Sequence, residues 1–404
     1  MNIGVEVREC RVCKGELEGV LELGDLYLSN FVPTIDNDLP SGPLNLVLCR
    51  DCNLAQLSHS VDPDLMYRQY WYKSGINETM RQELRDVVRQ ALEWWSPLPS
   101  RTRQYVWMDI GANDGYLLSQ VPTRSEFGPL FRRIGVEPAD NLRMELGEHC
   151  EKVVPTYFSA DAVAEQCDVI TSCAMFYDLN DPVRFCEDIA RLLKPEGVWV
   201  NQLSYTPQML REMEFDNICH EHNVYYTLET LQQVYKKAGL RIFDFTFNDI
   251  NGGSVRVAAC HRESRHERPV RTHEFREGVT REDYHRFARR VRKWRREMVN
   301  LIGKLWGQRI HVYGASTKGN TLLQYLGING AFECAADRNP AKNGLMMVGT
   351  WVPIVSEEES RAKEPDYYFV LPYAFLPEMR EREQKFLDGG GRLLVPLPDI
   401  RVIV

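Results

Sequence analysis

Two short segments of this chain combine residue types that can do chemistry, and they lie about a hundred residues apart. The first is the glycine-containing run DIGANDG at residues 109–115, which follows the apolar residues 105–108. A glycine turn at the end of a strand lets backbone N–H groups approach a nucleotide-type ligand closely. The second is His220-Glu221-His222, which offers a base, an acid and another imidazole. Together they predict a ligand pocket at a strand end and a base that activates a substrate.

The spacing within the glycine turn narrows the choice of ligand. Gly111 and Gly115 follow Asp109 with Gly-x-x-x-Gly spacing, whereas a dinucleotide fingerprint needs Gly-x-Gly-x-x-Gly. The next expected strand ends at Glu137, whose carboxylate can accept hydrogen bonds from both hydroxyls of a ribose. This combination resembles the class I methyltransferases that use S-adenosylmethionine (SAM).

That resemblance implies that the turn holds the amino-acid part of SAM and that Glu137 binds the ribose. Phe158, which leads into the strand expected at 168–172, would contact the adenine. The cofactor-binding residues implied are Asp109, Gly111, Asn113, Gly115, Glu137 and Phe158. Binding of NAD, or an α/β turn with no ligand, are the alternatives.

The His-Glu-His segment can be interpreted in three ways. In extended backbone, His220 and His222 would face one side and Glu221 the other, because side chains alternate along a strand. The position of the segment, between an expected strand and the helix expected at 228–238, favours catalysis. A metal site on His-x-His is one alternative, although no third ligand is evident. Two structural histidines are the other.

Four of the eleven cysteines form two pairs, Cys10-x-x-Cys13 and Cys49-x-x-Cys52, with 35 residues between the pairs. Each pair directs two thiolates at one point, and two such pairs complete a tetrahedral zinc site. A closed four-thiolate site is structural, because no coordination position remains for a substrate. Two unrelated pairs or a redox pair are the alternatives. The other seven cysteines are expected to be buried free thiols of a reducing compartment.

Length and composition limit the class of protein. A chain of 404 residues predicts two or three domains, and 44% hydrophobic residues are enough for buried cores. The net charge of −8 argues against binding a nucleic-acid backbone. No apolar run approaches the roughly 18 residues of a membrane span, and the N-terminus has no signal-peptide pattern. We therefore expect a cytoplasmic protein with neither nucleic-acid nor membrane partners, either a monomer or a weak homo-oligomer.

The order of elements predicts an α/β fold. Strands are expected at 106–110, 133–136, 168–172 and 197–203, with helices at 182–193 and 228–238, which argues for a parallel sheet covered on both faces. A second α/β pattern begins with a strand at 309–313, and continues with a helix at 321–326 and strands at 333–336, 367–371 and 392–395. Residues 62–95 are expected to be helical, with Pro97 and Pro99 after them.

These elements suggest five parts. The expected boundaries are a zinc-binding module at 1–62, a helical connection at 63–98, a SAM-binding domain at 99–260, a linker and long helix at 261–308, and a C-terminal Rossmann-like domain at 309–404 that binds a nucleotide sugar.

Three longer segments carry a more specific resemblance. Residues 215–226, 248–254 (NDINGGS) and 313–321 (YGASTKGNT) resemble the nucleotide-sugar C-methyltransferases, which modify ketosugars for antibiotics and surface polysaccharides. The resemblance covers nearly the whole chain. It implies a zinc-binding module, a class I methyltransferase Rossmann-like domain and a C-terminal Rossmann-like domain.

The resemblance also implies residue roles. His222 would be the general base, Glu221 would orient it or bind the sugar, and Tyr72 would approach the active site. The chain departs from the family pattern at two places. Cys219 stands where the family has a tyrosine, and Tyr177 or Asp178 where it has a histidine.

The expected chemistry is removal of the acidic proton beside the ketone of a 4-ketosugar, at C3 or C5, followed by methylation of that carbon. His220, Tyr72 or Tyr177 would donate a hydrogen bond to the enolate oxygen. Lys318 would bind the diphosphate, beside the backbone N–H groups of the second glycine turn. The substrate-binding residues expected are Tyr177, Asn251 and Lys318. An O- or N-methyltransferase and a non-catalytic SAM- or nucleotide-binding regulator are the alternatives.

Overall fold

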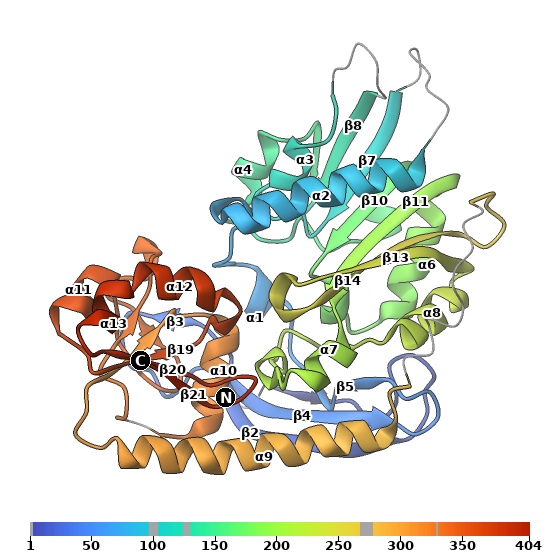
Figure 1. Cartoon of the computed structure of the whole chain (residues 1–404). Coiled ribbons are helices and arrows are strands. Elements are labelled where there is room, and N and C mark those ends of the chain that lie inside the picture. The colour runs from blue at the N-terminus through green and yellow to red at the C-terminus, as the bar shows by residue number, and fades with distance from the viewer. Residues whose placement is uncertain (1–2, 97–103, 124–129, 267–277, 329) are drawn as a thin grey trace.

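The computed structural model describes residues 3–96, 104–123, 130–266, 278–328 and 330–404. A small N-terminal sheet, a seven-stranded α/β domain and a six-stranded C-terminal α/β domain are the main parts of the molecule (Figure 1). The expected break at Pro97 and Pro99, with the boundary between 98 and 99, lies outside the described residues. So does the part of the expected linker at residues 267–277.

The N-terminal sheet is built on a long hairpin. Strand β2 (Leu17–Tyr27) pairs antiparallel with β4 (Ser41–Cys49), which pairs with β5 (Ala55–Leu57). The fourth strand, β12 (Val224–Tyr225), comes from far along the chain and completes the order β12-β5-β4-β2. The residues that follow His222 therefore belong to the sheet of the N-terminal module.

The central sheet has the order β13-β14-β11-β10-β7-β8-β9. Its strands are β7 (Gln104–Ile110), β8 (Leu130–Val136), β9 (Lys152–Val154), β10 (Cys167–Cys173), β11 (Leu193–Ser204), β13 (Leu240–Asn248) and β14 (Ser254–His261). The strand order reverses between β7 and β10, and the carboxyl ends of strands at such a point are where open α/β sheets bind ligands.

The expected strands and helices of this domain are confirmed, including α6 (Pro182–Leu192) and α8 (Leu228–Lys237). The four expected strands are parallel to one another, as expected, but the sheet also contains β14, which runs antiparallel to both β11 and β13. Only a short turn joins β13 to β14, and a parallel pair would need a much longer crossover. Asn251, Gly252 and Gly253 all have positive φ in that turn.

The segment expected to be helical from 62 to 95 is interrupted. It contains α1 (Asp64–Tyr67), the 3-10 turn η1 (Ser74–Ile76) and the long helix α2 (Glu78–Trp95). Between them the backbone groups of Tyr70 exchange hydrogen bonds with the side-chain amide of Asn141, at 3.0 and 2.9 Å. Side chains from the central domain therefore satisfy this backbone in place of helical hydrogen bonds.

The C-terminal sheet has the order β18-β16-β15-β19-β20-β21, and only β21 is antiparallel to its neighbour. The strands are β15 (Ile310–Tyr313), β16 (Ala335–Ala336), β18 (Ile354–Val355), β19 (Tyr367–Val370), β20 (Arg392–Val395) and β21 (Arg401–Ile403). Helix α10 (Thr317–Leu326) begins earlier than expected, because the Ser316 hydroxyl caps it by accepting a hydrogen bond from Gly319 N at 3.0 Å.

Helix α9 (Arg281–Lys304) runs along the base of the molecule (Figure 1). It contacts β2, α7 (Thr206–Arg211) and α10, which belong to three different parts of the chain. One hydrophobic core contains residues of β2, β4, α9 and the C-terminal sheet, while Cys10 and Cys49 belong to the core of the central domain. The N-terminal module thus packs against both α/β domains.

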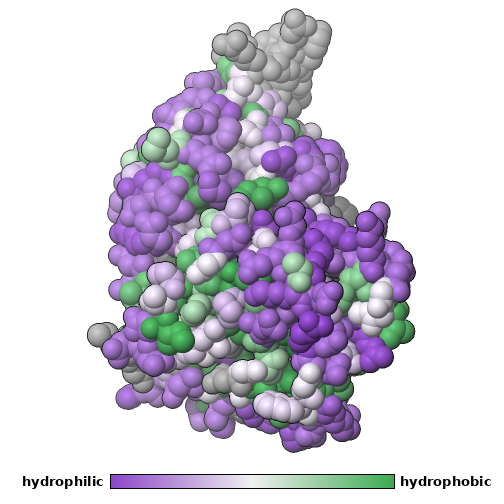
Figure 2. All heavy atoms as spheres, turned by 90° about the vertical axis from the view of Figure 1, so that its left-hand side faces the viewer, coloured by the Kyte–Doolittle hydropathy of each residue, from purple (hydrophilic) through white to green (hydrophobic). Residues whose placement is uncertain are grey.

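The face that carries the C-terminal domain is mostly hydrophilic, with small scattered hydrophobic clusters (Figure 2). Among the described residues, no helix is both long enough and apolar enough to cross a membrane.

Helix α2 is fixed to the sheet by a buried ion pair. Arg256 of β14 donates hydrogen bonds to Glu83 of α2, to Gln90 Oε1 at 2.8 Å and to Gln202 Oε1 at 2.7 Å. Glu83 is 8% exposed and Arg256 4% exposed, so neither charge is screened by water. Removing one partner would leave the other buried and uncompensated.

We predict that Glu83→Ala lowers the free energy of unfolding by about 3–5 kcal/mol, the usual cost of breaking a buried pair. The matched control is Glu93→Ala on the same helix, whose pair with Arg89 is exposed and should matter by less than about 1 kcal/mol. Urea denaturation followed by circular dichroism measures both. Equal effects would contradict the argument.

Candidate active site and structural metal site

The glycine turn follows β7 at the point where the strand order reverses. Gly111 and Gly115 have φ of +69° and +82°, a region that only glycine enters without strain. A Cβ at Gly111 would lie 3.3 Å from Met175 Cγ, so the missing side chain keeps the turn open toward the cavity. Gly111 N and Ala112 N both donate to Val136 O, which joins the turn to the end of β8.

Two carboxyl groups lie under this turn. Asp109 accepts a hydrogen bond from Thr171 Oγ1 at 2.7 Å, and burial raises its pKa to about 7. Glu137 accepts from Asn113 N at 2.8 Å and from Ala139 N at 2.9 Å, and burial raises its pKa as well. Each carboxylate oxygen of Glu137 keeps a second lone pair, so the group can still accept from ribose hydroxyls.

The turn also holds the segment that carries Tyr72. Asn113 donates from its side chain to Tyr72 O at 3.0 Å and accepts from Ser74 N at 3.0 Å. Asp114 accepts from Ser74 Oγ at 2.7 Å and from Gly75 N at 2.6 Å. The sequence analysis missed this role of Asn113 and Asp114, since no local pattern shows which distant backbone an amide or carboxylate will bind.

A cavity of about 610 Å³ lies over the turn and extends to the C-terminal domain. Most of the expected site residues line it: Tyr72, Asp109, Gly111, Asn113, Glu137, Phe158, Tyr177, Glu221, His222, Asn251 and Lys318. Gly115 is not in its lining. His220 lines a smaller cavity of about 270 Å³, which shares Glu221 with the large one.

The His-Glu-His segment is a turn and not extended backbone. His222 N donates to Cys219 O at 3.1 Å, which closes the turn. His220 Nε2 donates to Gly42 O of β4 at 3.1 Å, so this imidazole is tied to the N-terminal module. The turn separates the two histidines and brings Cys219, Glu221 and His222 together.

The environment of His222 keeps its imidazole neutral and oriented. Nδ1 donates to Asn217 O at 2.8 Å, since a carbonyl can only accept, and Nε2 therefore carries the lone pair. The ring of Tyr177 lies 4.3 Å from the imidazole, centre to centre. Burial and the nearby Lys318 ammonium lower the pKa of His222 to about 3, so the ring is unprotonated at neutral pH.

Lys318 reaches into this site from the first turn of α10 and donates to the side-chain oxygen of Asn217. Its charge faces buried acids: burial raises the pKa of Glu221 to about 7 and that of Glu214 to about 8, and Lys318 opposes both shifts. Asp216, also buried, accepts from Tyr373 Oη at 2.8 Å. The sequence analysis missed Glu214, Asp216 and Tyr373, because their shared cavity exists only when the two domains are packed together.

The His-Glu-His turn is anchored to the N-terminal module. Tyr225 and Val224 of β12 pair with Ala55 and Gln56, and Leu57 N donates to Asn223 O at 2.9 Å. Arg11, between Cys10 and Cys13, places its guanidinium 3.3 Å from Asn223 Oδ1 and 2.7 Å from Leu57 O. The residue next to His222 is therefore held by the loop between two of the cysteines.

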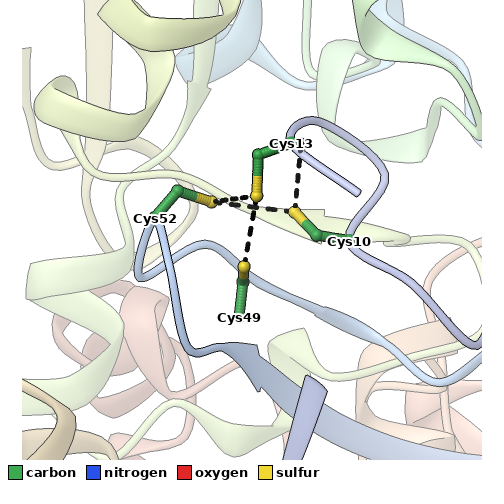
Figure 3. A group of neighbouring side chains, drawn as sticks. All are labelled: Cys10, Cys13, Cys49 and Cys52. Atoms are coloured by element: carbon green, nitrogen blue, oxygen red, sulfur yellow. Dashed lines mark hydrogen bonds between the residues drawn. The ribbon is translucent and has the colours of Figure 1, made fainter. Parts of the chain in front are cut away.

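The four paired cysteines converge on one point (Figure 3). The Sγ–Sγ distances are 3.7 Å for Cys10–Cys52, 3.3 Å for Cys13–Cys49 and 3.4 Å for Cys13–Cys52. Zinc–sulfur bonds of about 2.3 Å in a tetrahedron place sulfurs about 3.8 Å apart, so this group fits a zinc ion. All eleven cysteines are free of disulfide bonds, as expected.

Comparison with known families assigns a description to each part of the chain. Residues 10–67 match the family described as "Putative zinc binding domain", and residues 76–244 match "Methyltransferase domain". Residues 249–398 match "C-methyltransferase C-terminal domain". The C-methyltransferase NovU of Streptomyces niveus is 29% identical over 417 residues, covering 98% of this chain and 97% of the relative.

The chain is a SAM-dependent C-methyltransferase. It has the class I methyltransferase fold with a zinc-binding N-terminal domain, and its cofactors are SAM and zinc. Solved structures similar to this C-methyltransferase include the N-methyltransferase NodS from Bradyrhizobium japonicum WM9, with 14% identity and a TM-score of 0.34 over 46% of this chain and 98% of that one. Another is the SAM-dependent methyltransferase from Clostridium acetobutylicum ATCC 824, with 9% identity and a TM-score of 0.34 over 45% and 92%.

We predict that Cys10→Ser lowers the zinc content of this C-methyltransferase and destabilises its N-terminal module. Structural zinc contributes roughly 10–16 kcal/mol in small peptides, so loss of one thiolate should matter far more than loss of a free thiol. Cys150→Ser is the matched control, since Cys150 lies outside the cluster. Metal analysis and thermal unfolding measure both, and the assignment fails if the freshly purified protein holds no zinc.

We also predict that Glu137→Ala weakens SAM binding by about 1.5–3 kcal/mol, the worth of hydrogen bonds to a charged group. Glu148→Ala, an exposed glutamate of the same domain, should leave the affinity unchanged. Isothermal calorimetry with SAM gives both values. An unchanged affinity in Glu137→Ala would remove this carboxylate from the cofactor site.

Proposed function

We propose that this enzyme methylates the carbon beside the ketone of a nucleotide-linked ketosugar. The observation that carries the proposal is one continuous cavity, which joins the glycine turn and Glu137 to His222 and Lys318. SAM supplies an electrophilic methyl group when it is bound at the turn. A base and a cation at the far end of the same cavity are what a carbon acid beside a carbonyl requires.

His222 is the base in this proposal. Its neutral ring presents the Nε2 lone pair, while Asn217 O holds Nδ1–H and fixes the orientation of the ring. The proton leaves the carbon beside the ketone for Nε2, and the resulting imidazolium is stabilised by the buried carboxyl of Glu221. A positioned base contributes roughly 10²–10⁴ in rate.

Lys318 is the cation that stabilises the developing negative charge in this proposal. As the proton leaves, negative charge develops on the ketone oxygen, and a fixed cation in a buried cavity stabilises it more strongly than water does. Lys318 Nζ lies at Asn217, the residue that also orients His222. We therefore assign Lys318 to the reacting end of the substrate, in place of the diphosphate expected from the sequence.

The smaller cavity supports a nucleotide on the substrate. Tyr72, Glu221, Ser316 and Thr317 line both cavities, so a sugar at His222 would leave room for a group extending into the smaller one. Aromatic rings of Phe31 and Trp71 lie in its wall, together with Lys342. Aromatic faces stack on bases, and lysine binds phosphate as a point charge.

The proposal is tested by turnover on a panel of 4-keto nucleotide sugars with SAM. We expect formation of S-adenosylhomocysteine and a product in which a methyl group on carbon replaces hydrogen. A product methylated on oxygen or nitrogen would favour the alternative of an O- or N-methyltransferase. Binding of SAM with no turnover on any sugar of the panel would count against the proposal.

We predict that His222→Asn retains SAM binding and lowers turnover by roughly 10²–10⁴, because the amide cannot accept a proton at neutral pH. Deuterium exchange into the ketosugar without SAM isolates the base. Wild type should incorporate solvent deuterium beside the ketone, and the variant should not.

His220→Asn is the comparison variant. It removes the hydrogen bond from His220 to Gly42 of β4. It should therefore affect the free energy of unfolding more than the rate of deuterium exchange into the ketosugar. If wild type and His222→Asn exchange at equal rates, the base is another residue, with Tyr72 or Glu221 next to test.

A further inference from the structure

The turn that carries the proposed base also assembles a set of metal-binding atoms. Cys219, Glu221 and His222 each offer one donor atom, and these three atoms lie within 4.8 Å of one another. A thiolate, a carboxylate and an imidazole are three ligand types that zinc takes in proteins. The set arises because the turn between Cys219 O and His222 N brings three near-consecutive side chains to one side.

Two further observations point to a cation at this place. His222 Nδ1 donates to Asn217 O at 2.8 Å, the outer hydrogen bond that orients a metal-bound histidine and leaves Nε2 free for the metal. Asp178 Oδ1 is buried with no hydrogen-bond partner among the described residues. Asp178 lines the same cavity as Glu221 and His222.

We propose that Cys219, Glu221 and His222 form a second metal site, which binds a zinc-type divalent ion reversibly and competes with catalysis. With the ion on Nε2, the imidazole cannot accept a proton, so metal occupancy and base action exclude one another. Only this competition rests on the proposed function; the binding of the ion does not.

Geometry and charge indicate that the second site is weaker than the four-cysteine site. Bonds of about 2.0–2.3 Å require donor atoms about 3.3–3.8 Å apart, and the donor atoms lie within 4.8 Å of one another, so no pair must close by more than about 1.5 Å. The facing charges are mixed, since Glu221 and Asp178 attract the ion while the Lys318 ammonium repels it. The site has three protein ligands, which leaves a fourth position for water or a substrate oxygen.

Cobalt binding tests the site without turnover. Protein that holds its structural zinc is titrated with Co²⁺, and zinc retention is checked by metal analysis. Wild type should take up one further equivalent and show thiolate-to-cobalt absorption. Cys219→Ser should lose that absorption, and Cys150→Ser should keep it. No further equivalent in wild type, or unchanged absorption in Cys219→Ser, would overturn the site.

Glu221→Gln provides a second variant, since its amide is a poor metal ligand of similar size. Its affinity for Co²⁺ should fall by at least about tenfold, the lower end of what even an outer partner of a metal ligand contributes. An unchanged affinity would remove Glu221 from the ligand set.

Zinc inhibition tests the competition. Added Zn²⁺ should inhibit wild-type methyl transfer and a chelator should restore it, whereas Cys219→Ser should need at least about tenfold more Zn²⁺ for the same fractional loss. If the metal site is filled and methyl transfer is unimpaired, the proposed competition between metal binding and catalysis is wrong. Cobalt binding through Cys219 in a protein that transfers no methyl to any ketosugar would count against the proposed function alone.

Discussion

The geometry of the active site depends on the pairing of two short strands, β12 and β5. The turn that carries His222 lies between a 3-10 turn at Phe215–Asn217 and β12, so it has little regular structure of its own. Its position is set by the sheet of the N-terminal module, to which β12 adds as the outermost strand. The paired cysteines fix the loops of that module, and Arg11 between two of them donates to Asn223. A structural zinc ion can thus influence the position of the proposed base, which it never contacts.

Burial shifts the pKa values of the ionisable groups that line the cavity. Acidic groups at the glycine turn and around the His-Glu-His turn lose water when the domains pack, which raises the pKa of Asp109, Glu214 and Glu221. The same burial lowers the pKa of His222. Carboxyl groups that surround a site favour a cationic ligand such as the sulfonium of SAM. Lys318 brings positive charge to the end where a carbonyl oxygen would become negative.

The features that could be predicted from the sequence are local. The glycine turn, the strands around it and the cysteine pairs depend on residues close together in the chain, and their positions agree with the structure. The antiparallel β14 depends on a turn of Asn251, Gly252 and Gly253 whose backbone angles no periodicity shows.

The contacts that complete the site were not predictable, because they join residues far apart. Arg11 and Asn223 are 212 residues apart, and Lys318 and Asn217 are 101 apart. In an extended backbone, the two histidines of the His-Glu-His segment would face the same side. Tertiary packing made this segment a turn, and this decided which histidine faces the cavity.

The shared core of the N-terminal hairpin has a consequence for biosynthesis. On the ribosome, β2, β4 and β5 emerge first, but β12 follows only at residue 224, and the core partners in the C-terminal sheet follow near the end of the chain. Until then the hairpin exposes apolar side chains, and β5 has an open edge that can pair with other chains. Such long-range closure is slow. Early zinc capture by the cysteines would shorten the time for which the nascent module is exposed to aggregation.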